Sequence, residues 1–254
     1  MSAKLKVFLH SITLFASLSL CAQEFPAGRT ALSLPANPTV LELTRLFLET
    51  TAGQHDPFQV IPAVVRMGNK VVPSLRGFLF ETPIIKVAVL DSTGVVEDSV
   101  NAPPPNRVYG VMALDLIGTP AAYQVLADVV RLDTNGEVRG EALRAFAVNC
   151  YSRVVQGSLQ PDTGVVHLLL GYMDDTTYVG GCSMKIGSIA RQGLQNWTGI
   201  DYGEIVPDNL KAKDEKTLGM TLAEYREQWW QQISSTMQWN SIAGCYDLGK
   251  PKQK

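Results

Sequence analysis

The sequence predicts an all-α fold built from pairs of short helices, and three observations support this prediction. Apolar residues recur at helical spacing through most of the chain, and glycine, proline and capping residues divide these stretches into short helices. A similar pair of helices also occurs more than once, as in helical repeat proteins. The chain has 254 residues, 46% of them hydrophobic, which is enough for one sizeable core or a short repeat array.

The first helices are expected soon after Pro38. Spacings of three and four predict an opening helix with one apolar face, formed by Val40, Leu41, Leu43, Thr44, Phe47 and Leu48. Asp56 followed by Pro57 is typical of an N-cap with proline at the first helical position. A helix is therefore expected from there to Met67, closed by Gly68, with a partner helix that buries Val71, Val72, Leu75, Phe78 and Leu79.

The same arrangement returns downstream. We expect Asn106 to cap a helix that ends at Gly118, and Thr119 with Pro120 to start its partner. The partner carries apolar residues at i, i+3, i+4 and i+7, namely Ala122, Val125, Leu126 and Val129. Similar helical hairpins are thus predicted around Gly68 and Gly118.

A third and a fourth unit continue the pattern. The turn at residues 133–136 precedes a helix over residues 138–146, and a second helix follows Pro161 and Asp162. Its buried residues, forty-four positions after those of the previous second helix, are Val166, Leu169, Leu170 and Met173. The next first helix is expected to bury Val179, Cys182, Ile186 and Ile189. Spacings of roughly 40–47 residues are typical of helical solenoids.

Three stretches resemble the HEAT-repeat superfamily, and the resemblance covers about residues 57–194. They are Arg107–Leu132; Asp133 with Val138–Arg139 and Ala142–Leu143; and the helix expected from Val179 to Leu194. The resemblance implies a short α-α superhelix of HEAT-like hairpins in which the second helices line the inner wall.

The tail is similar to the closing segment of bacterial extracytoplasmic HEAT-like proteins, in which an LTG-x-D-[FY]-G element precedes a final helix ending in tryptophans. Here Trp197 replaces the leucine, and residues 204–220 lengthen the link. Thr221 with Glu224 three residues on predicts a capping box. Tyr225 and Trp229 lie four residues apart, so we expect one face of this C-terminal capping helix, with Trp229 packed, to cover the last repeat.

Residues 83–105 do not fit the repeat. Their β-branched run, residues 84–90, has strand propensity, but a single strand has no partner in a helical array. We therefore expect an irregular excursion here, of the kind that is often functional or mobile.

The first 22 residues have the pattern of a secretory signal peptide, because Lys4 and Lys6 precede an apolar, acid-free stretch that ends at Ala22. Two alternatives remain open: a single-span anchor, for which the stretch is short, and a lipoprotein signal ending at Cys21. The expected organisation is a signal peptide at 1–22, a linker at 23–37, HEAT-like repeats at 38–200 and a capping segment at 201–254. The expected location is secreted or periplasmic, or lipid-anchored at Cys21.

Charge and cysteine content narrow the functional classes. Removing residues 1–22 leaves 20 basic and 24 acidic residues, so the formal charge changes from -2 to -4 and a basic nucleic-acid footprint is absent. No later stretch is apolar enough to span a membrane. Three cysteines remain, and an odd count argues against a disulfide framework, although one pair with one free thiol is open: Cys150, Cys182 and Cys245. Aligning Val138 with Val179 places Cys150 and Cys182 near opposite helix ends, so we expect no bond between them.

No motif for a catalytic residue, metal or cofactor is present: the chain has no His-x-Glu, Cys-x-x-Cys, Gly-x-Ser-x-Gly or P-loop pattern. The candidate binding residues lie on the predicted second helices, where they are expected to form a shallow ridge, and are Tyr123, Asp128, His167 and Tyr172. A solvent-facing ridge without a ligand is the alternative.

These observations favour a non-catalytic protein-binding or scaffold module with a protein partner. The alternative is an enzyme, such as a HEAT-like lyase or hydrolase, that uses His167 with a carboxylate. A third possibility is a structural part of a larger envelope assembly.

Overall fold

The computed structural model describes residues 32, 34–81, 87–91, 94–98, 107–179, 184–200 and 221–248. The elements below belong to one compact unit that starts at Leu34. The expectations for the signal peptide, Cys21, the Asn106 cap, Cys182 and residues 201–220 lie outside the described residues.

Helix starts follow the local capping signals of the sequence. Helix α2 (Val40–Thr51) begins after Thr39, which forms a reciprocal capping box with Glu42. Asp56 caps α3 (Pro57–Val65), which confirms the predicted N-cap with proline at the first position. The chain then passes through a 3₁₀ turn, η2 (Gly68–Val71), into α4 (Val72–Phe80).

The predicted boundary between the two central helices, α5 and α6, is confirmed. Helix α5 (Arg107–Ile117) ends at Gly118, whose φ of 63° is readily adopted only by glycine. Thr119 then caps α6 (Pro120–Leu132) by accepting a hydrogen bond from the Ala122 amide. The predicted inward faces are confirmed in α6 and in α9 (Thr163–Tyr172), since every predicted residue is buried: Ala122, Val125, Leu126, Val129, Val166, Leu169, Leu170 and Met173.

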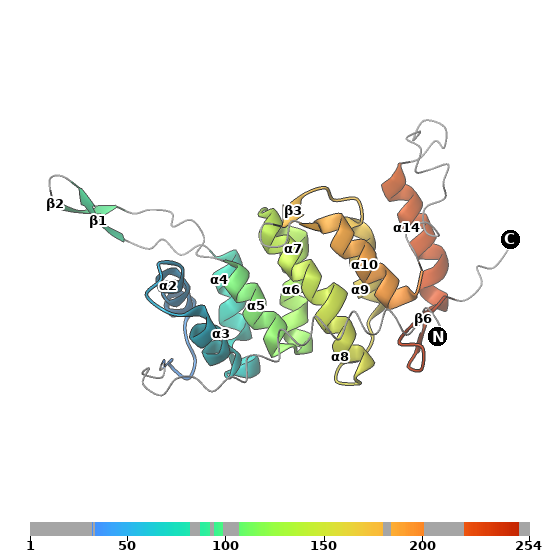
Figure 1. Ribbon diagram of the computed structural model, residues 1–254, viewed down its shortest axis with the longest axis horizontal. Coiled ribbons are helices and arrows are strands. Elements are labelled where there is room, and N and C mark those ends of the chain that lie inside the picture. Colours follow the sequence, from blue (N-terminus) through green and yellow to red (C-terminus); the bar gives the residue numbers. More distant parts are fainter. Residues whose placement is uncertain are drawn as a thin grey trace. The chain divides into compact units, whose positions relative to one another are not determined.

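Helices that were predicted to be equivalent in successive units contact one another (Figure 1). The first helices α3, α5, α7 (Gly136–Arg144) and α10 (Ile186–Thr198) meet in chain order. The second helices α4 and α6 meet as well, and α9 contacts α14 (Leu222–Ile233). The described fold is therefore mostly helical, as predicted.

Helix α7 does not end at Arg144. It continues through a π-helical stretch, η3 (Ala145–Cys150), into α8 (Tyr151–Val155). π-Helical turns are rare and often occur at functional sites. Here η3 contacts α10, and its Asn149 belongs to the polar cluster described below.

The expected helix from Val179 to Leu194 begins later than predicted. Val179 belongs to β3 (Tyr178–Val179), which pairs antiparallel with β4 (Met184–Lys185), and the helix starts at Ile186. Two glycines, at positions 180 and 181, lie in the first turn of the predicted helix, and each costs about 1 kcal/mol relative to alanine. The alignment of Val138 with Val179, on which the cysteine prediction relied, is therefore wrong. Cys150 itself has a free thiol.

The expected irregular excursion contains a β-hairpin instead. Strand β1 (Val87–Asp91) pairs antiparallel with β2 (Gly94–Asp98). The prediction was wrong because it considered only the first strand, whereas the partner follows within a few residues.

The tail forms two structures. Thr221 and Glu224 make the predicted capping box at the start of α14. After a 3₁₀ turn, η4 (Ser234–Thr236), a hairpin that the sequence analysis did not anticipate joins β5 (Gln238–Asn240) and β6 (Cys245–Asp247). Strand β6 contacts α10. Among the described helices, none combines the length and the apolar character needed to cross a bilayer.

Candidate functional site

The four residues predicted to form a ridge do not all reach the surface. Asp128 and Tyr172 are half-buried and His167 is exposed, but Tyr123 is buried. Tyr123 shares a helical face with Leu126, Ala127 and Val130, which are all buried, so the inward side of α6 is broader than the predicted stripe. The expectation of Tyr123 on the ridge is thus not met.

Tyr123 instead belongs to a buried polar cluster. Its hydroxyl donates to Asp115 Oδ1 at 3.3 Å and accepts from Arg153 Nη1 at 3.2 Å. Asn149, in the π-helical stretch, donates to the other Asp115 oxygen. Burial raises the pKa of the Asp115 carboxyl, although the Asn149 hydrogen bond opposes this shift. Every member is partnered, so the cluster joins α5, α6 and α8 internally.

Cys150 lies at the end of the same π-helical stretch. Its burial raises the pKa of the thiol to about 12, which keeps it protonated near neutral pH. A buried thiol in this state is a poor nucleophile and acts as a small apolar group.

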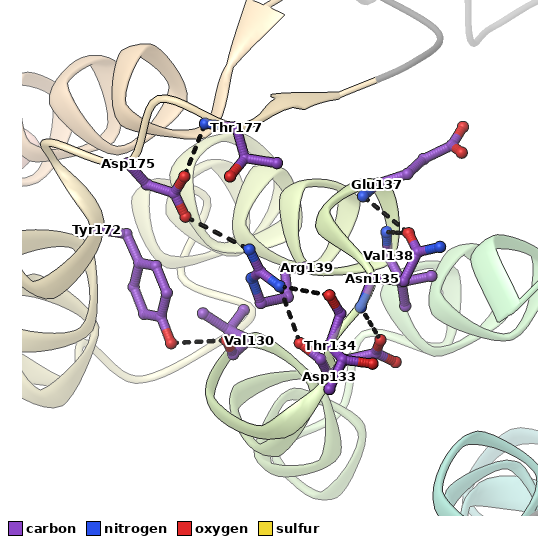
Figure 2. A network of polar contacts seen from close by, with 10 residues as sticks. All are labelled: Val130, Asp133, Thr134, Asn135, Glu137, Val138, Arg139, Tyr172, Asp175 and Thr177. Carbon is purple, nitrogen blue, oxygen red and sulfur yellow. Dashed lines mark hydrogen bonds and ion pairs between the residues drawn. The ribbon is translucent and has the colours of Figure 1, made fainter.

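Two contacts join the exposed sides of the second helices. Arg76 on α4 forms an ion pair with Asp128 on α6, with 3.0 Å between Arg76 Nη2 and Asp128 Oδ2. The Tyr172 hydroxyl on α9 donates to the Val130 carbonyl on α6 at 2.7 Å (Figure 2). Asp128 and Tyr172 therefore connect neighbouring helices and do not meet each other in any described contact.

A network beside Tyr172 fixes the turns that orient these helices (Figure 2). Arg139 Nη1 donates to the carbonyls of Asp133 and Thr134, and its other terminal nitrogen lies 3.6 Å from Asp175 Oδ2. Asp133 Oδ2 is buried without a hydrogen bond, but the Arg107 guanidinium 3.0 Å away balances its charge. The network ties the turn before α7 to the turn after α9.

His167 forms both a hydrogen bond and a ring stack at the surface of the site. Its Nε2 lies 2.9 Å from Glu227 Oε2, and its ring stacks on Trp230 with 4.8 Å between centroids and 5° between planes. The His167 and Glu227 side chains keep 48% and 49% of their surface exposed. His167 on α9 thus contacts two residues of α14.

The ionised state of Glu227 determines which of the two residues donates this hydrogen bond. The hydrogen bond from His167, followed by one from Gln231, lowers the pKa of the Glu227 carboxyl. Glu227 is therefore ionised near neutral pH and can only accept, so His167 Nε2 carries the donated proton.

A second ionic contact lies at the end of α9. Arg226 on α14 pairs with Asp174, which also accepts from Arg191 Nη2 at 3.4 Å. Arg191 Nε additionally donates to the Met173 carbonyl at 2.8 Å. Asp174 therefore joins α9, α10 and α14.

Sequence reasoning missed the face of α14 that meets α9. It selected Tyr225 and Trp229, but both are only half-buried, and the contacts to α9 come from Arg226, Glu227 and Trp230. Trp230 lies three and four residues after the other two, so helical spacing places all three on one side. The spacing shows that these three residues share a side of the helix, but not that this side meets α9.

Trp197 has a different environment, at the end of α10. It is completely buried, and its Nε1 donates to the Phe146 carbonyl at 3.1 Å. Tyr151, Trp239 and Tyr246 surround its ring, with centroids 5.8–6.2 Å away. The β5–β6 hairpin, rather than α14, covers this residue.

Within the described ranges, no three His, Cys, Asp or Glu side chains are grouped so that they could hold a metal ion. The chain matches no protein-family model, and comparison with curated proteins and solved structures gives no significant match. The geometry of the second helices is therefore the basis for a functional proposal.

Proposed function

We propose that this chain is a non-catalytic protein-binding or scaffold module of the cell envelope or the secreted space, with a HEAT-like superhelical repeat array. It binds a protein partner through what we term the second-helix surface: Arg76, Asp128, Tyr172, His167, Glu227 and Trp230. The observation that supports this proposal is the set of side-chain contacts that link α4 to α6, α6 to α9 and α9 to α14.

Contacts of this kind suit a binding surface. Stacked helices provide extended area, and polar side chains already held by a neighbour lose less conformational entropy when a partner binds. Arg76, His167 and Glu227 remain half-exposed and can make further hydrogen bonds. The surface alternates in charge, which favours a partner with mixed charge over a nucleic acid.

The pair of His167 and Glu227 also fits the alternative hypothesis of an enzyme that uses this histidine with a carboxylate. The geometry favours docking over catalysis. His167 Nε2 is committed to Glu227, and Trp230 covers one ring face. Both the His167 and Glu227 side chains are open to water, which weakens electrostatic stabilisation of a transition state.

Affinity enrichment from the envelope and secreted fractions tests the proposal, using the exported form of the protein with two matched variants. Gln124→Arg adds a charge on the exposed side of α6, on the same face as Asp128, and Gln195→Arg adds one on α10, a first helix. We expect a partner to be enriched by the wild type and by Gln195→Arg but lost with Gln124→Arg. Equal enrichment by both variants, or no enriched partner, contradicts the proposal.

A further inference from the structure

Helix α14 is held to α9 in an unusual way. Of its twelve residues only Ile233, at the C-terminal end, is buried. The described contacts near its middle are the His167–Glu227 hydrogen bond, the His167–Trp230 stack and the Arg226–Asp174 ion pair. By contrast, α9 buries five of its ten residues. Polar and aromatic contacts, rather than an apolar core, therefore position α14.

Such contacts are reversible. The His167 and Glu227 side chains are half-exposed, so water competes for their hydrogen bond. The Arg226 side chain is only 12% exposed, and its ion pair is the firmer contact. The capping box of Thr221 and Glu224 stabilises the first turn of α14 without help from α9. The helix can therefore keep local structure when it separates.

The α9 surface that contacts α14 presents specific groups to it. The imidazole of His167 offers a flat face to an indole, and its Nε2–H donates to a carboxylate. Asp174, seven residues further on and just beyond the end of α9, receives a guanidinium. The complementary helix carries a cation and an acid in succession and an aromatic residue three positions after the acid, as Arg226, Glu227 and Trp230 do.

We propose that the α9 surface around His167 is a receptor for a partner helix with this pattern of cation, acid and tryptophan, and that α14 occupies it in cis as a displaceable mimic. The inference deepens the proposed binding function and rests on it. When α14 is docked, its Glu227 and Trp230 complete the second-helix surface and cover His167 on α9. A partner helix must displace them to reach His167, so the apparent affinity for this helix is reduced in proportion to the fraction of open molecules.

A labelled peptide with the sequence of residues 221–233 tests the inference on the full-length protein. Trp230→Ala in the protein weakens cis docking but leaves His167 and Asp174 in place. We expect the peptide to bind this variant about tenfold more tightly than the wild type, because a larger fraction of molecules is open. Adding His167→Ala should abolish that gain. A peptide with both Glu227→Ala and Trp230→Ala serves as the control and should not bind.

Equal binding to the wild type and Trp230→Ala, or binding that survives His167→Ala, overturns the inference. Circular dichroism checks that each variant folds; if Trp230→Ala does not, Glu227→Ala in the protein replaces it with the same expectation. The two proposals fail separately. If a partner is enriched and is lost with Gln124→Arg, but the peptide does not bind, only this inference fails. If the peptide binds at α9 but no such partner is enriched, only the proposed function of the second-helix surface fails.

Discussion

Two aromatic contacts attach the C-terminal segment to the helices, and they differ in exposure to water. The β5–β6 hairpin packs Trp239 and Tyr246 around the fully buried Trp197 of α10. Helix α14 places Trp230 on the half-exposed His167 of α9. Both use tryptophan, but only the first removes a large apolar area from water, so we interpret it as the structural anchor and the second as a surface interaction.

The hydrogen-bond partners in these two regions differ in the same way, one set being buried and the other open to water. The indole N–H of Trp197 has a buried acceptor, the Phe146 carbonyl, so this tryptophan is satisfied without water. Glu227 and His167 satisfy one another in a place where water can replace either partner. Burial rather than residue type therefore separates the two regions.

Replacing Trp197 or Trp230 by alanine should give the largest difference in stability between the two regions. We expect Trp197→Ala to lower the free energy of unfolding by about 3–5 kcal/mol, the range for a buried aromatic residue. Trp230→Ala should cost about 1 kcal/mol, as for a stacked surface pair. Urea unfolding followed by far-ultraviolet circular dichroism measures both, and equal losses would show that the distinction between anchor and surface is wrong.

Replacing a glycine on α10 or on α9 by alanine should give a smaller difference in stability. A Cβ at Gly187, at the start of α10, would lie 2.7 Å from the Met173 carbonyl oxygen and 2.8 Å from that of Asp175, whereas a Cβ at Gly171 on α9 would meet nothing within 4 Å. We expect Gly187→Ala to destabilise the protein by about 1–3 kcal/mol and Gly171→Ala to stabilise it by up to about 1 kcal/mol. Thermal unfolding of both variants provides the comparison, and destabilisation by Gly171→Ala would indicate that α9 is covered there.

The smallest expected effect is a pH dependence confined to α14. The Glu227 pKa is lowered in the folded protein, so its stabilising contribution is present above the ordinary value of 4.5 and is lost as the pH falls through the lowered value. With 5-fluorotryptophan labelling, the ¹⁹F resonance of Trp230 should shift in this acidic window while that of Trp197 stays constant.

The matched control for this titration is on the same helix. Glu224 also has a lowered pKa, because of its hydrogen bonds with Thr221, but it does not contact His167 in any described interaction. Glu227→Gln should remove the Trp230 shift and Glu224→Gln should leave it. A shift that disappears in Glu224→Gln instead would assign it to fraying of the capping box.

Local signals in the sequence predicted much of the helical fold. Asp56, Thr119 and Thr221 cap helices through contacts within three residues, and such contacts depend little on the rest of the molecule. The inward faces of α6 and α9 were predicted because their apolar spacing has a single interpretation. The start of α10 was not, since two glycines outweighed the apolar periodicity that includes Val179.

The candidate site was predictable only in part. His167 was identified from its place on a second helix, but its partners lie sixty or more residues away, at Glu227 and Trp230. Both faces of α14 carry aromatic residues, so the periodicity alone did not show which one meets α9. Tyr123 was assigned to the surface because it lies on a predicted second helix outside the apolar stripe. Its burial depends on Asp115 and Arg153 from other helices.

Native-state hydrogen exchange of the wild-type protein at increasing denaturant tests the central distinction most directly, because it reports the free energy of opening for each element. We predict that the amides of α14 exchange through a local opening well below the global free energy of unfolding. The amides of β5, β6 and the end of α10 should exchange only through global unfolding. A single opening free energy shared by α14 and the β5–β6 hairpin would contradict the account.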